Sequence, residues 1–302
     1  MTDHIPDQTG RTIVVTGANS GLGLHTSTAL AAKGARVLMA CRSPERGAAA
    51  VKEVGGAAEL VVLDLSDLAS VREAAARIRE LTGDAVDVLV NNAGVMATPR
   101  SSTADGFELQ LGTNHLGHAA LTWLLMPALR TRPGARVVTV SSLLHRRGAF
   151  DVDDPNFERR RYDAWVAYGQ SKTANLLFAF ELDRRARAAG LDLTSVAVHP
   201  GLSDTELMGN TMRSRGARLL APVATTFIKV MGQPARRGAL PSLHAVTAPD
   251  VQGGQFWGPD GFQQMRGNPK IVHALPHATD PAVAARVWDL TAKLTGVTPD
   301  PA

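Results

Sequence analysis

Short runs of β-branched and other apolar residues alternate with longer stretches of helical spacing along most of the chain. The runs are almost continuously apolar, so both faces of the predicted strands are expected to be buried, as in a parallel sheet covered by helices. The longer stretches carry apolar residues three and four positions apart, which is the period of a helix with one buried face. Seven strands are predicted, at residues 11–17, 35–41, 58–65, 86–94, 135–142, 191–201 and 253–258.

The predicted helices begin at recognisable signals. Ser43 precedes Pro44, an arrangement that caps a helix and starts its first turn. Because strands and helices alternate, the pattern predicts an α/β fold, a doubly wound Rossmann-type domain with a seven-stranded parallel sheet and helices on both faces. The helices are expected at residues 23–34, 43–54, 67–81, about 105–130 and around 164–180.

One domain from residue 10 to residue 302 is the simplest division of the chain, after a polar N-terminal tail of residues 1–9. The sequence contains no internal repeat, low-complexity tract or flexible linker that would mark a second domain. Two irregular stretches, residues 143–162 and 201–233, are longer than ordinary connections in compact domains. We expect them to form the substrate-binding segments.

Composition excludes several classes of protein. Hydrophobic residues make up 44% of the 302 and charged residues 20%, so burial of a core can stabilise the fold by itself. The single Cys41 cannot form an internal disulfide, and no metal site is expected. Residues 1–10 lack the apolar core of a signal peptide, and the apolar run at 121–129 is only about half of a membrane span. We therefore expect a soluble, cytoplasmic protein without a membrane anchor.

The net charge is +4, and arginines provide most of the basic side chains. They are scattered along the chain and accompany no recognition motif for DNA or RNA. We therefore do not expect nucleic acid to be a partner.

The segment TGANSGLG, residues 16–23, joins the first predicted strand to the first helix. Gly17 permits a tight turn, Gly21 lets the backbone approach a pyrophosphate, and Gly23 allows close packing at the helix start. The helix N-terminus then offers free N–H groups and the positive end of its dipole to phosphate. Dinucleotide binding is the favoured interpretation, and a purely structural turn is the alternative. The expected contacts are Gly17, Asn19, Ser20, Gly21, Leu22 and Gly23.

The second predicted strand ends in ACRS, residues 40–43, without the acidic residue that usually binds the ribose 2′-hydroxyl of NAD. Arg42 stands where a 2′-phosphate would lie, and its guanidinium suits phosphate geometry, with Arg46 as an assistant. NADP(H) is therefore favoured over NAD(H), and a surface arginine is the alternative. Asp64, with Leu65 beside it, either faces the adenine or only precedes the next helix.

Tyr168 and Lys172 lie four residues apart, so they project from one face of a predicted helix. A free phenol has a pKa of about 10, and a nearby ammonium favours the phenolate. We therefore expect Lys172 to lower the pKa of Tyr168 and to make it a general acid or base. Ser142 ends the fifth strand at the carboxyl edge of the sheet, where its hydroxyl can hold a substrate oxygen. The alternatives are an ordinary helix pair and a strand-end cap.

These motifs occur together with others in one order along the chain. They are TGANSGLG (16–23), NNAG (91–94), Asn114, Ser142, YGQSK (168–172) and HPG (199–201). Over nearly the whole chain the sequence resembles the short-chain dehydrogenase/reductase family. Four further stretches make it similar to the branch of retinol dehydrogenases and WW-domain oxidoreductases, including bacterial members: ACRS, NHLGH (114–118), VSSLLH (140–145) and the tail at 280–296.

The resemblance implies a role for each expected catalytic residue. Tyr168 would exchange a proton with the substrate oxygen, and Lys172 would hold the nicotinamide ribose and lower the pKa of Tyr168. Ser142, rather than its neighbour Ser141, would orient the carbonyl or alcohol. Asn114 would use its backbone carbonyl to hold a water that connects Lys172 to solvent. The further cofactor contacts implied are Asn91, Ala93, Gly94, Tyr168, Lys172, Pro200, Gly201 and Thr205.

Two features depart from related groups. Membrane-bound retinol dehydrogenases carry an apolar N-terminal anchor, which this sequence lacks. Light-dependent protochlorophyllide reductases use a cysteine near the substrate, whereas Cys41 is expected beside the nucleotide ribose. Protochlorophyllide reduction is therefore not expected.

The expected function is that of an NADP-dependent oxidoreductase, a carbonyl reductase or alcohol dehydrogenase, that interconverts a lipophilic ketone or aldehyde and its alcohol. A nucleotide-binding sensor or scaffold with weak or no catalysis is the alternative. His145 either touches substrate or lies exposed in a loop. Apolar side chains of the irregular segments either line a substrate pocket or only pack on the sheet; they are Phe150, Phe157, Trp165, Leu202, Leu207 and Met208.

The resemblance also implies a homodimer or homotetramer that pairs the helices around 105–130 and 163–188 across a two-fold axis. The apolar run at 121–126 fits such an interface and also fits a buried face. Trp288 and Leu290 are expected to be core contacts of the last helix.

Overall fold

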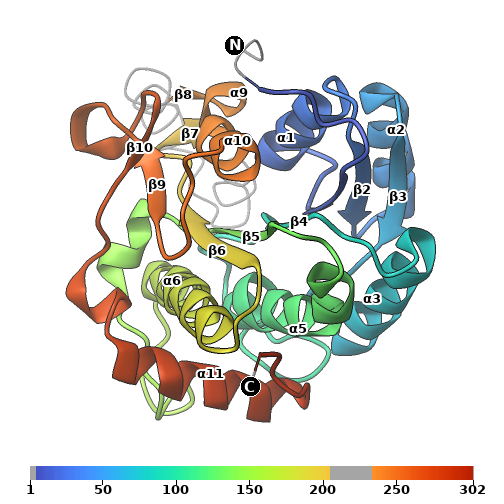
Figure 1. Cartoon of the computed structure of the whole chain (residues 1–302). Coiled ribbons are helices and arrows are strands. Elements are labelled where there is room, and N and C mark those ends of the chain that lie inside the picture. Colours follow the sequence, from blue (N-terminus) through green and yellow to red (C-terminus); the bar gives the residue numbers. More distant parts are fainter. Residues whose placement is uncertain (1–4, 205–232, 302) are drawn as a thin grey trace.

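The computed structural model describes residues 5–204 and 233–301, and one eight-stranded sheet forms its centre (Figure 1). Seven of the strands run parallel in the order β3-β2-β1-β4-β5-β6-β9, which confirms the predicted α/β, doubly wound fold. The parallel strands are β1 (Thr12–Thr16), β2 (Arg36–Cys41), β3 (Ala58–Val62), β4 (Val88–Asn91), β5 (Ala135–Val140), β6 (Leu193–Val198) and β9 (Phe256–Pro259).

An eighth strand, which was not predicted, extends the sheet beyond its seven parallel strands. β10 (Pro269–Ile271) pairs antiparallel with β9 at the edge of the sheet. It has only three residues, and Lys270 and Ile271 are exposed. A strand this short at a sheet edge has no buried face and therefore leaves no apolar pattern in the sequence.

Helices cover both faces of the sheet (Figure 1). The first hydrophobic core lies between the sheet and α3, α5 and α6, and the second lies on the opposite face under α1, α2 and α10. These helices are α1 (Gly21–Ala31), α2 (Pro44–Val54), α3 (Leu68–Thr82), α5 (Gly117–Arg130), α6 (Ala164–Ala188) and α10 (Leu240–Thr247). As predicted, the Ser43 side chain caps α2 by accepting a hydrogen bond from Arg46 N, and Pro44 is the first helical residue.

The helix predicted at about 105–130 is not continuous. It consists of a short turn, α4 (Leu109–Leu111), a π-helical turn at Gly112–Leu116, and then α5. A π-helical turn closes its hydrogen bond over five residues instead of four, and such turns are frequent at functional sites. Helical periodicity does not distinguish this local widening from regular helix.

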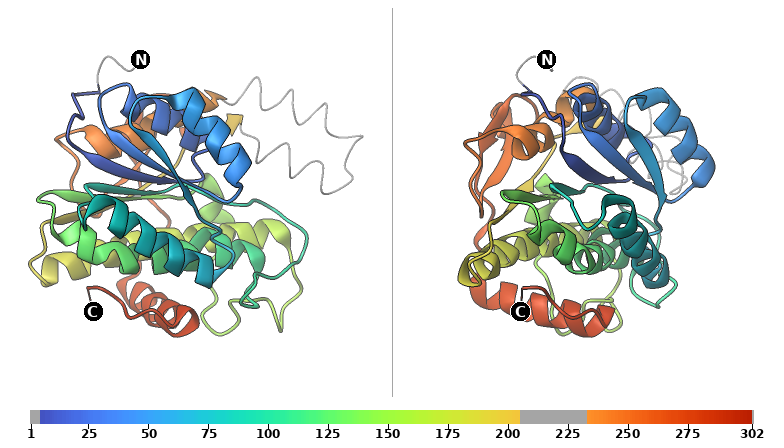
Figure 2. Two further views of the ribbon diagram at one scale, coloured as in Figure 1. Left: turned by 90° about the vertical axis from the view of Figure 1, so that its right-hand side faces the viewer. Right: turned by 45° about the vertical axis from the view of Figure 1, so that its right-hand side comes forward.

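A last helix, α11 (Pro281–Thr295), adds an outer layer below α5 and α6 (Figures 1 and 2). Trp288 is 1% exposed and packs with its ring centroid 4.9 Å from that of Trp123 and 5.3 Å from that of Phe178. Trp288 is therefore a core residue, as expected, and Leu290 packs against a neighbouring cluster. The apolar run at 121–126 lies mostly in the first core, so the buried-face interpretation of that run holds.

The N-terminal segment and the second irregular segment also contain buried residues and short strands. Ile5 and Gln8, in the segment predicted as a polar tail, are buried. Residues 205–232, most of the second expected substrate segment, lie outside the described residues. This range includes Thr205, Leu207 and Met208, for which contacts with cofactor or substrate were expected. On either side of them, β7 (Ser203–Asp204) pairs with β8 (Gln233–Pro234). None of the helices within 5–204 and 233–301 combines the length and apolar character that a membrane crossing requires.

Candidate active site

The glycine loop after β1 is packed too tightly for side chains at two positions. A Cβ atom at Gly17 would lie 2.9 Å from Cα of Ala93, and one at Gly23 would overlap the carbonyl oxygen of Gly17. Gly17 and Gly21 also have φ angles of 63° and 54°, in the left-handed region that favours glycine. The loop therefore brings its backbone close to the exit of β4 and leaves its outer side open.

The N-terminus of α1 follows this loop with features of an anion site. Ser20 is the N-cap residue, but its side chain makes no capping hydrogen bond, and no acidic residue lies in the first turn of this helix. Its first backbone N–H groups and the positive end of its dipole therefore remain available to a negatively charged ligand.

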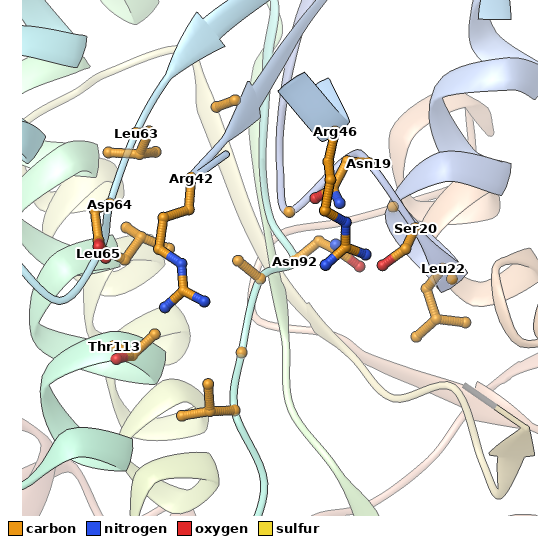
Figure 3. Close-up of a pocket in the computed structure, with 17 residues that line it drawn as sticks. Asn19, Ser20, Leu22, Arg42, Arg46, Leu63, Asp64, Leu65, Asn92 and Thr113 are labelled. Carbon is orange, nitrogen blue, oxygen red and sulfur yellow. The ribbon is translucent and has the colours of Figure 1, made fainter. Parts of the chain in front are cut away.

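A cavity of about 240 Å³ opens at this loop (Figure 3). Its walls come from the carboxyl ends of β1, β2 and β4 and from the segment after β3. The Thr113 hydroxyl, from the π-helical turn, lies on the wall without a hydrogen-bond partner among the described residues. The expected cofactor residues on its lining are Gly17, Asn19, Ser20, Gly21, Leu22, Gly23, Arg42, Asp64, Leu65, Ala93 and Gly94.

Two arginines from the end of β2 and the start of α2 reach into this cavity. Figure 3 shows the guanidinium of Arg42 extending past Asp64 on the side of Thr113, while the guanidinium of Arg46 lies between Asn92 and Ser20. Both arginines are exposed. The cavity end at β2 thus presents positive charge, with Asp64 as the carboxylate on the facing wall.

The side chain of Asn91, an expected cofactor contact, points away from the cavity. Its side-chain amide donates to Thr122 Oγ1 at 3.0 Å, under α5, and the residue is 1% exposed and does not line the cavity. The next residue, Asn92, lines the cavity instead and donates to the Thr16 carbonyl at 2.7 Å. Successive side chains of a strand point to opposite faces, so the NNAG motif alone could not decide which asparagine faces the loop.

Asn114 lies in the π-helical turn and fastens three segments to one another. Its Oδ1 accepts from Val95 N at 2.8 Å, and its Nδ2 donates to Val95 O and to Ser171 Oγ, each at 2.9 Å. The exit of β4, the π-helical turn and α6 are therefore held together by one fully buried side chain.

The two serines that end β5 point in different directions. Ser141 is 2% exposed and donates to the Lys172 carbonyl at 2.8 Å, so it holds the strand to α6. Ser142 is less buried, accepts from Leu144 N at 3.2 Å, and its hydroxyl hydrogen-bonds Tyr168. Of the two, Ser142 is the hydroxyl that faces the phenol.

Tyr168 and Lys172 lie together on α6, but their electrostatics differ from the expectation. Burial raises the pKa of Tyr168 to about 12, an effect that the hydrogen bond from Ser142 partly offsets. Burial lowers the pKa of Lys172 to about 8. The Lys172 amine donates to the Val140 carbonyl at 3.0 Å and lies 5.7 Å from the centroid of the Tyr168 ring. Desolvation therefore outweighs the attraction between the two groups in the chain without ligand.

Gly94 connects the cavity to this pair. It lines the cavity, and a Cβ atom on it would lie 3.6 Å from Lys172 Nζ and 3.1 Å from Asn114 Oδ1. The glycine loop, the arginines and the Ser142, Tyr168 and Lys172 side chains thus lie along one edge of the sheet, at the carboxyl ends of its strands. Ligands of doubly wound folds bind at this edge.

Comparison with known proteins identifies the family. Residues 11–216 match the model of the family described as short chain dehydrogenase. The chain belongs to the short-chain dehydrogenase family. It is therefore an NAD(P)-dependent oxidoreductase, as the members of that family are.

Relatives of this short-chain dehydrogenase include retinol dehydrogenases, in agreement with the predicted branch. The chain is 38% identical to human retinol dehydrogenase 13 over 296 residues, which cover 95% of this chain and 85% of that protein. It is 40% identical to a Streptomyces lividans protein named "Probable oxidoreductase", covering 94% of this chain and 97% of the relative. A solved structure of an uncharacterized protein from Mycobacterium paratuberculosis superposes with a TM-score of 0.82, at 42% identity, covering 98% and 97% of the two chains.

The HPG segment of the dehydrogenase is bound to the loop after β9. His199 is buried, accepts from Gly201 N through Nδ1 at 3.1 Å, and lies 3.2 Å from Gln264 Oε1 through Nε2. A Cβ atom at Gly201 would overlap the Met265 carbonyl, and its φ angle is 68°. Gly201, and Pro200 before it, therefore lie in a turn whose path is set by a distant loop.

His145 is not an exposed loop histidine, which was one of the two expectations. It is fully buried rather than exposed, its Nδ1 lies 2.7 Å from the Ser142 carbonyl, and its ring packs edge-on against Phe256. Because the Ser142 carbonyl can only accept, His145 donates to it and holds the turn that follows Ser142.

Packing accounts for several apolar candidates. Phe150 belongs to a buried cluster with Leu111 and Leu177, and Phe157 is 1% exposed beneath Arg160. Trp165 is different, because it packs with Met96 against Tyr168. Leu202 is partly buried beside the loop after β9, and its N–H donates to the Met265 carbonyl in that loop.

Sequence reasoning did not single out a polar cluster at the start of α6. Glu108 is buried and accepts hydrogen bonds from Gln110 N, Leu111 N and the Tyr162 hydroxyl. Gln110 in turn binds Ala97 N and Tyr162. The cluster fastens the loop before α4 to the segment that precedes Tyr168. Its only sequence signal is a glutamate and a glutamine within an otherwise apolar stretch.

Proposed function

We propose that this dehydrogenase interconverts a lipophilic ketone or aldehyde and its alcohol, with NADP(H) preferred over NAD(H). The observation that carries the proposal is the buried Tyr168, hydrogen-bonded to Ser142, one helical turn from Lys172 and next to the end of the glycine-loop cavity.

Three features of the cavity suit a dinucleotide. The glycine loop leaves no room for Cβ atoms, the uncapped start of α1 can bind a pyrophosphate, and the Thr113 hydroxyl has no partner among the described residues that line the wall. Asp64 and Leu65 would contact the adenosine half, and Ala93, Gly94 and Lys172 would contact the nicotinamide half. When bound, the nicotinamide supplies or accepts a hydride at the substrate carbon.

The residues of the chain then handle the substrate oxygen. Ser142 holds that oxygen through its hydroxyl and Tyr168 gives it a proton during reduction, or takes one during oxidation. A pKa of about 12 keeps Tyr168 protonated at neutral pH but makes it a weak acid. The proposal therefore needs the charged Lys172 to lower that pKa when the cofactor is bound. Lys172, once charged, stabilises the phenolate that remains, and Asn114 holds the neighbouring backbone in place.

NADP(H) is preferred because two exposed arginines, Arg42 and Arg46, enter the cavity at the end of β2, where an NAD-dependent enzyme usually carries a carboxylate. A planar guanidinium binds a 2′-phosphate through paired, charge-assisted hydrogen bonds.

The substrate class is inferred from the surroundings of Tyr168. Met96, Leu144 and Trp165 pack around its ring and form an apolar wall on the substrate side. Relatives named retinol dehydrogenases support an apolar aldehyde or alcohol. All-trans-retinal and a small aliphatic ketone are therefore suitable first substrates for this chain.

Tyr168→Phe tests the proposal. With NADPH and all-trans-retinal, we expect turnover to fall by about 10²–10⁴-fold, the usual contribution of a general acid. The control is Tyr162→Phe, because Tyr162 is the other tyrosine of the chain and its hydroxyl binds Glu108 and the Thr98 carbonyl instead. Turnover by Tyr168→Phe at more than about a tenth of the wild-type rate would contradict the assigned role.

A catalytically weak sensor on the same fold is the second candidate, favoured by one observation: the Lys172 amine binds the Val140 carbonyl and leaves the phenol pKa raised. Tight NADPH binding without turnover of any aldehyde or ketone in a broad panel would support the sensor and overturn the reductase.

A further inference from the structure

His118 is a buried, titratable side chain to which the reaction above gives no role. It is 2% exposed, lies in α5, and follows Asn114 by one helical turn. One ring nitrogen, Nε2, lies 2.8 Å from Thr16 Oγ1, and the other, Nδ1, lies 2.9 Å from the backbone carbonyl oxygen of Asn114. His118 therefore bridges the end of β1, beneath the glycine loop, and the π-helical turn.

The hydrogen bonds of Thr16 determine which nitrogen of His118 carries the proton. The Thr16 hydroxyl oxygen accepts from Asn92 N and from Ala93 N, each at 2.9 Å. A hydroxyl has two acceptor positions and one proton, so both acceptor positions are filled. Its proton must go to a third partner, and His118 Nε2 at 2.8 Å is much nearer than the Val90 carbonyl at 3.4 Å. Nε2 is therefore an acceptor.

The Asn114 side of the ring leads to the same tautomer independently. A carbonyl oxygen can only accept, so His118 Nδ1 must donate to it. The pKa of His118 is lowered to about 3, mainly by burial and also by the titratable groups that face it, Lys172 and His115, while the hydrogen bond to Asn114 acts in the opposite direction. The ring is thus neutral at physiological pH, with its proton on Nδ1.

The position of this bond links it to the reacting groups. In the π-helical turn Gly117 N donates to Gly112 O, five residues earlier, and the helix is locally widened there. The side chain of His118 reaches back across this widened turn to the Asn114 carbonyl. The Asn114 side chain binds Val95 and Ser171, and its Oδ1 approaches Gly94, which also approaches Lys172.

We propose that His118 is a positioning residue: it fixes the Asn114 backbone carbonyl and the π-helical turn beside Lys172, and couples that geometry to the glycine loop through Thr16. The effect on rate rests on the proposed function, whereas the tautomer rests on hydrogen bonding alone. The coupling means that a correctly folded nucleotide site and a correctly aligned Lys172 depend on the same imidazole.

Two variants separate positioning from bulk packing. His118→Phe keeps an aromatic ring but removes both hydrogen bonds, whereas His118→Asn keeps an N–H donor near the place of Nδ1. With NADPH and all-trans-retinal, we expect His118→Phe to lower kcat by about tenfold or more and to change KM by less than about threefold. It should also shift the pH profile of kcat, and His118→Asn should recover kcat to within about threefold of the wild type. His273→Phe, at an exposed histidine, is the control.

Two kinetic results would overturn the proposal. One is a wild-type kcat and pH profile in His118→Phe, and the other is equal impairment of the phenylalanine and asparagine variants, which would indicate packing alone.

A measurement on the wild-type chain avoids dependence on folding of the variants and on turnover. Nitrogen NMR of the chain labelled with ¹⁵N-histidine reports the tautomer of each imidazole, and His118 is assigned by the signal that the asparagine variant lacks. We expect a neutral ring with its proton on Nδ1 and no titration between about pH 5 and pH 9. A proton on Nε2, or a titration in that interval, would contradict the proposal even if the protein proved to be an active reductase. The expected tautomer without any turnover would instead leave the geometry intact and count against the proposed function.

Discussion

At the scale of single residues, burial has more influence on the site than pairwise attraction. Lys172 and Tyr168 share a helix face, yet burial lowers the pKa of the amine and raises that of the phenol. Removal of water from both groups costs more free energy than their mutual attraction returns. A bound anionic cofactor would supply the negative charge that Lys172 lacks in the chain without ligand.

The shifted pKa of Lys172 predicts how stability depends on pH. Its pKa is about 8 in the folded chain and 10.5 ordinarily, so between these values the unfolded chain binds a proton that the folded chain does not. The contribution of Lys172 to the free energy of unfolding should therefore rise with pH across this window, by about 3 kcal/mol from the free-energy equivalent of the shift. Urea unfolding without cofactor at several pH values measures it. Lys172→Met should lack the rise and exposed Lys52→Met should keep it; the same rise in all three proteins would contradict the assignment.

The raised pKa of Tyr168 acts in the opposite direction and at higher pH. Between about pH 10 and 12 the folded chain retains a proton that the unfolded chain has lost, so stability should fall there. Burial also raises the pKa of the Cys41 thiol from 9.0 to about 11, which lowers stability from about pH 9 upward. The Lys172 effect is therefore best measured as the difference between the wild type and Lys172→Met, and below about pH 9.

Arg42 permits a direct test of cofactor preference. Arg42→Asp replaces the exposed guanidinium of the cavity with a carboxylate that repels a 2′-phosphate. Fluorescence titration should find that Kd for NADPH rises by roughly ten- to hundredfold, the loss expected for one charge-assisted hydrogen bond, while Kd for NADH changes much less. Arg77→Asp, at an exposed position of α3 outside the cavity, is the control. Equal losses for the two nucleotides would exclude a role for Arg42 in selecting NADP(H).

At the scale of elements, the site is assembled where secondary structure departs from regularity. The π-helical turn before α5 presents Thr113 to the cavity and Asn114 to Val95, and His118, in the first turn of α5, faces Thr16. Directly after it, a Cβ atom at Gly117 would overlap the Leu65 carbonyl, so α5 approaches the exit of β3 closely. Periodicity predicted a helix through this region, but the widened turn depends on contacts with β1, β4 and α6, which a linear pattern does not contain.

The same scale explains which parts of the site could be predicted. The glycine loop, Arg42, Ser142, Tyr168 and Lys172 follow strands or share one helix face, so their proximity follows from the order of elements. Asn91 was placed at the cofactor because the motif does not reveal the direction of a side chain at a strand end. The environment of His145 could not be predicted, because burial of its turn depends on Phe256, which lies on a distant strand.

At the scale of the whole molecule, α11 adds a layer whose position in the molecule the alternation of strands and helices does not predict. It lies below α5 and α6 (Figure 2), and Thr291 within it lies 2.9 Å from Nε2 of His115 in the π-helical turn. Trp288 stacks on Phe178 and carries the Arg185 guanidinium 4.9 Å from its ring. The C-terminal helix therefore covers apolar surface of α5 and α6.

Trp288→Ala measures the contribution of this layer. Removing a fully buried aromatic ring that packs on two others should lower the free energy of unfolding by about 3–5 kcal/mol. Asp289→Ala, the exposed neighbour in the same helix, should change it by no more than about 0.5 kcal/mol. Denaturant unfolding of both variants gives the comparison, and a small effect at Trp288 would indicate that α11 is only loosely attached.

The sequence by itself determined the strand order along the chain, the alternation of helices, the glycine loop and the spacing of Tyr168 and Lys172. These features are local: periodicity, turn chemistry and helix geometry act between residues that are close in the chain. Tertiary structure alone decided that Asn92 rather than Asn91 faces the cavity, and that His118 joins Thr16 to Asn114. It also decided the pKa values of Tyr168 and Lys172, because desolvation depends on every element packed around a group, and that packing exists only after the distant segments have come together.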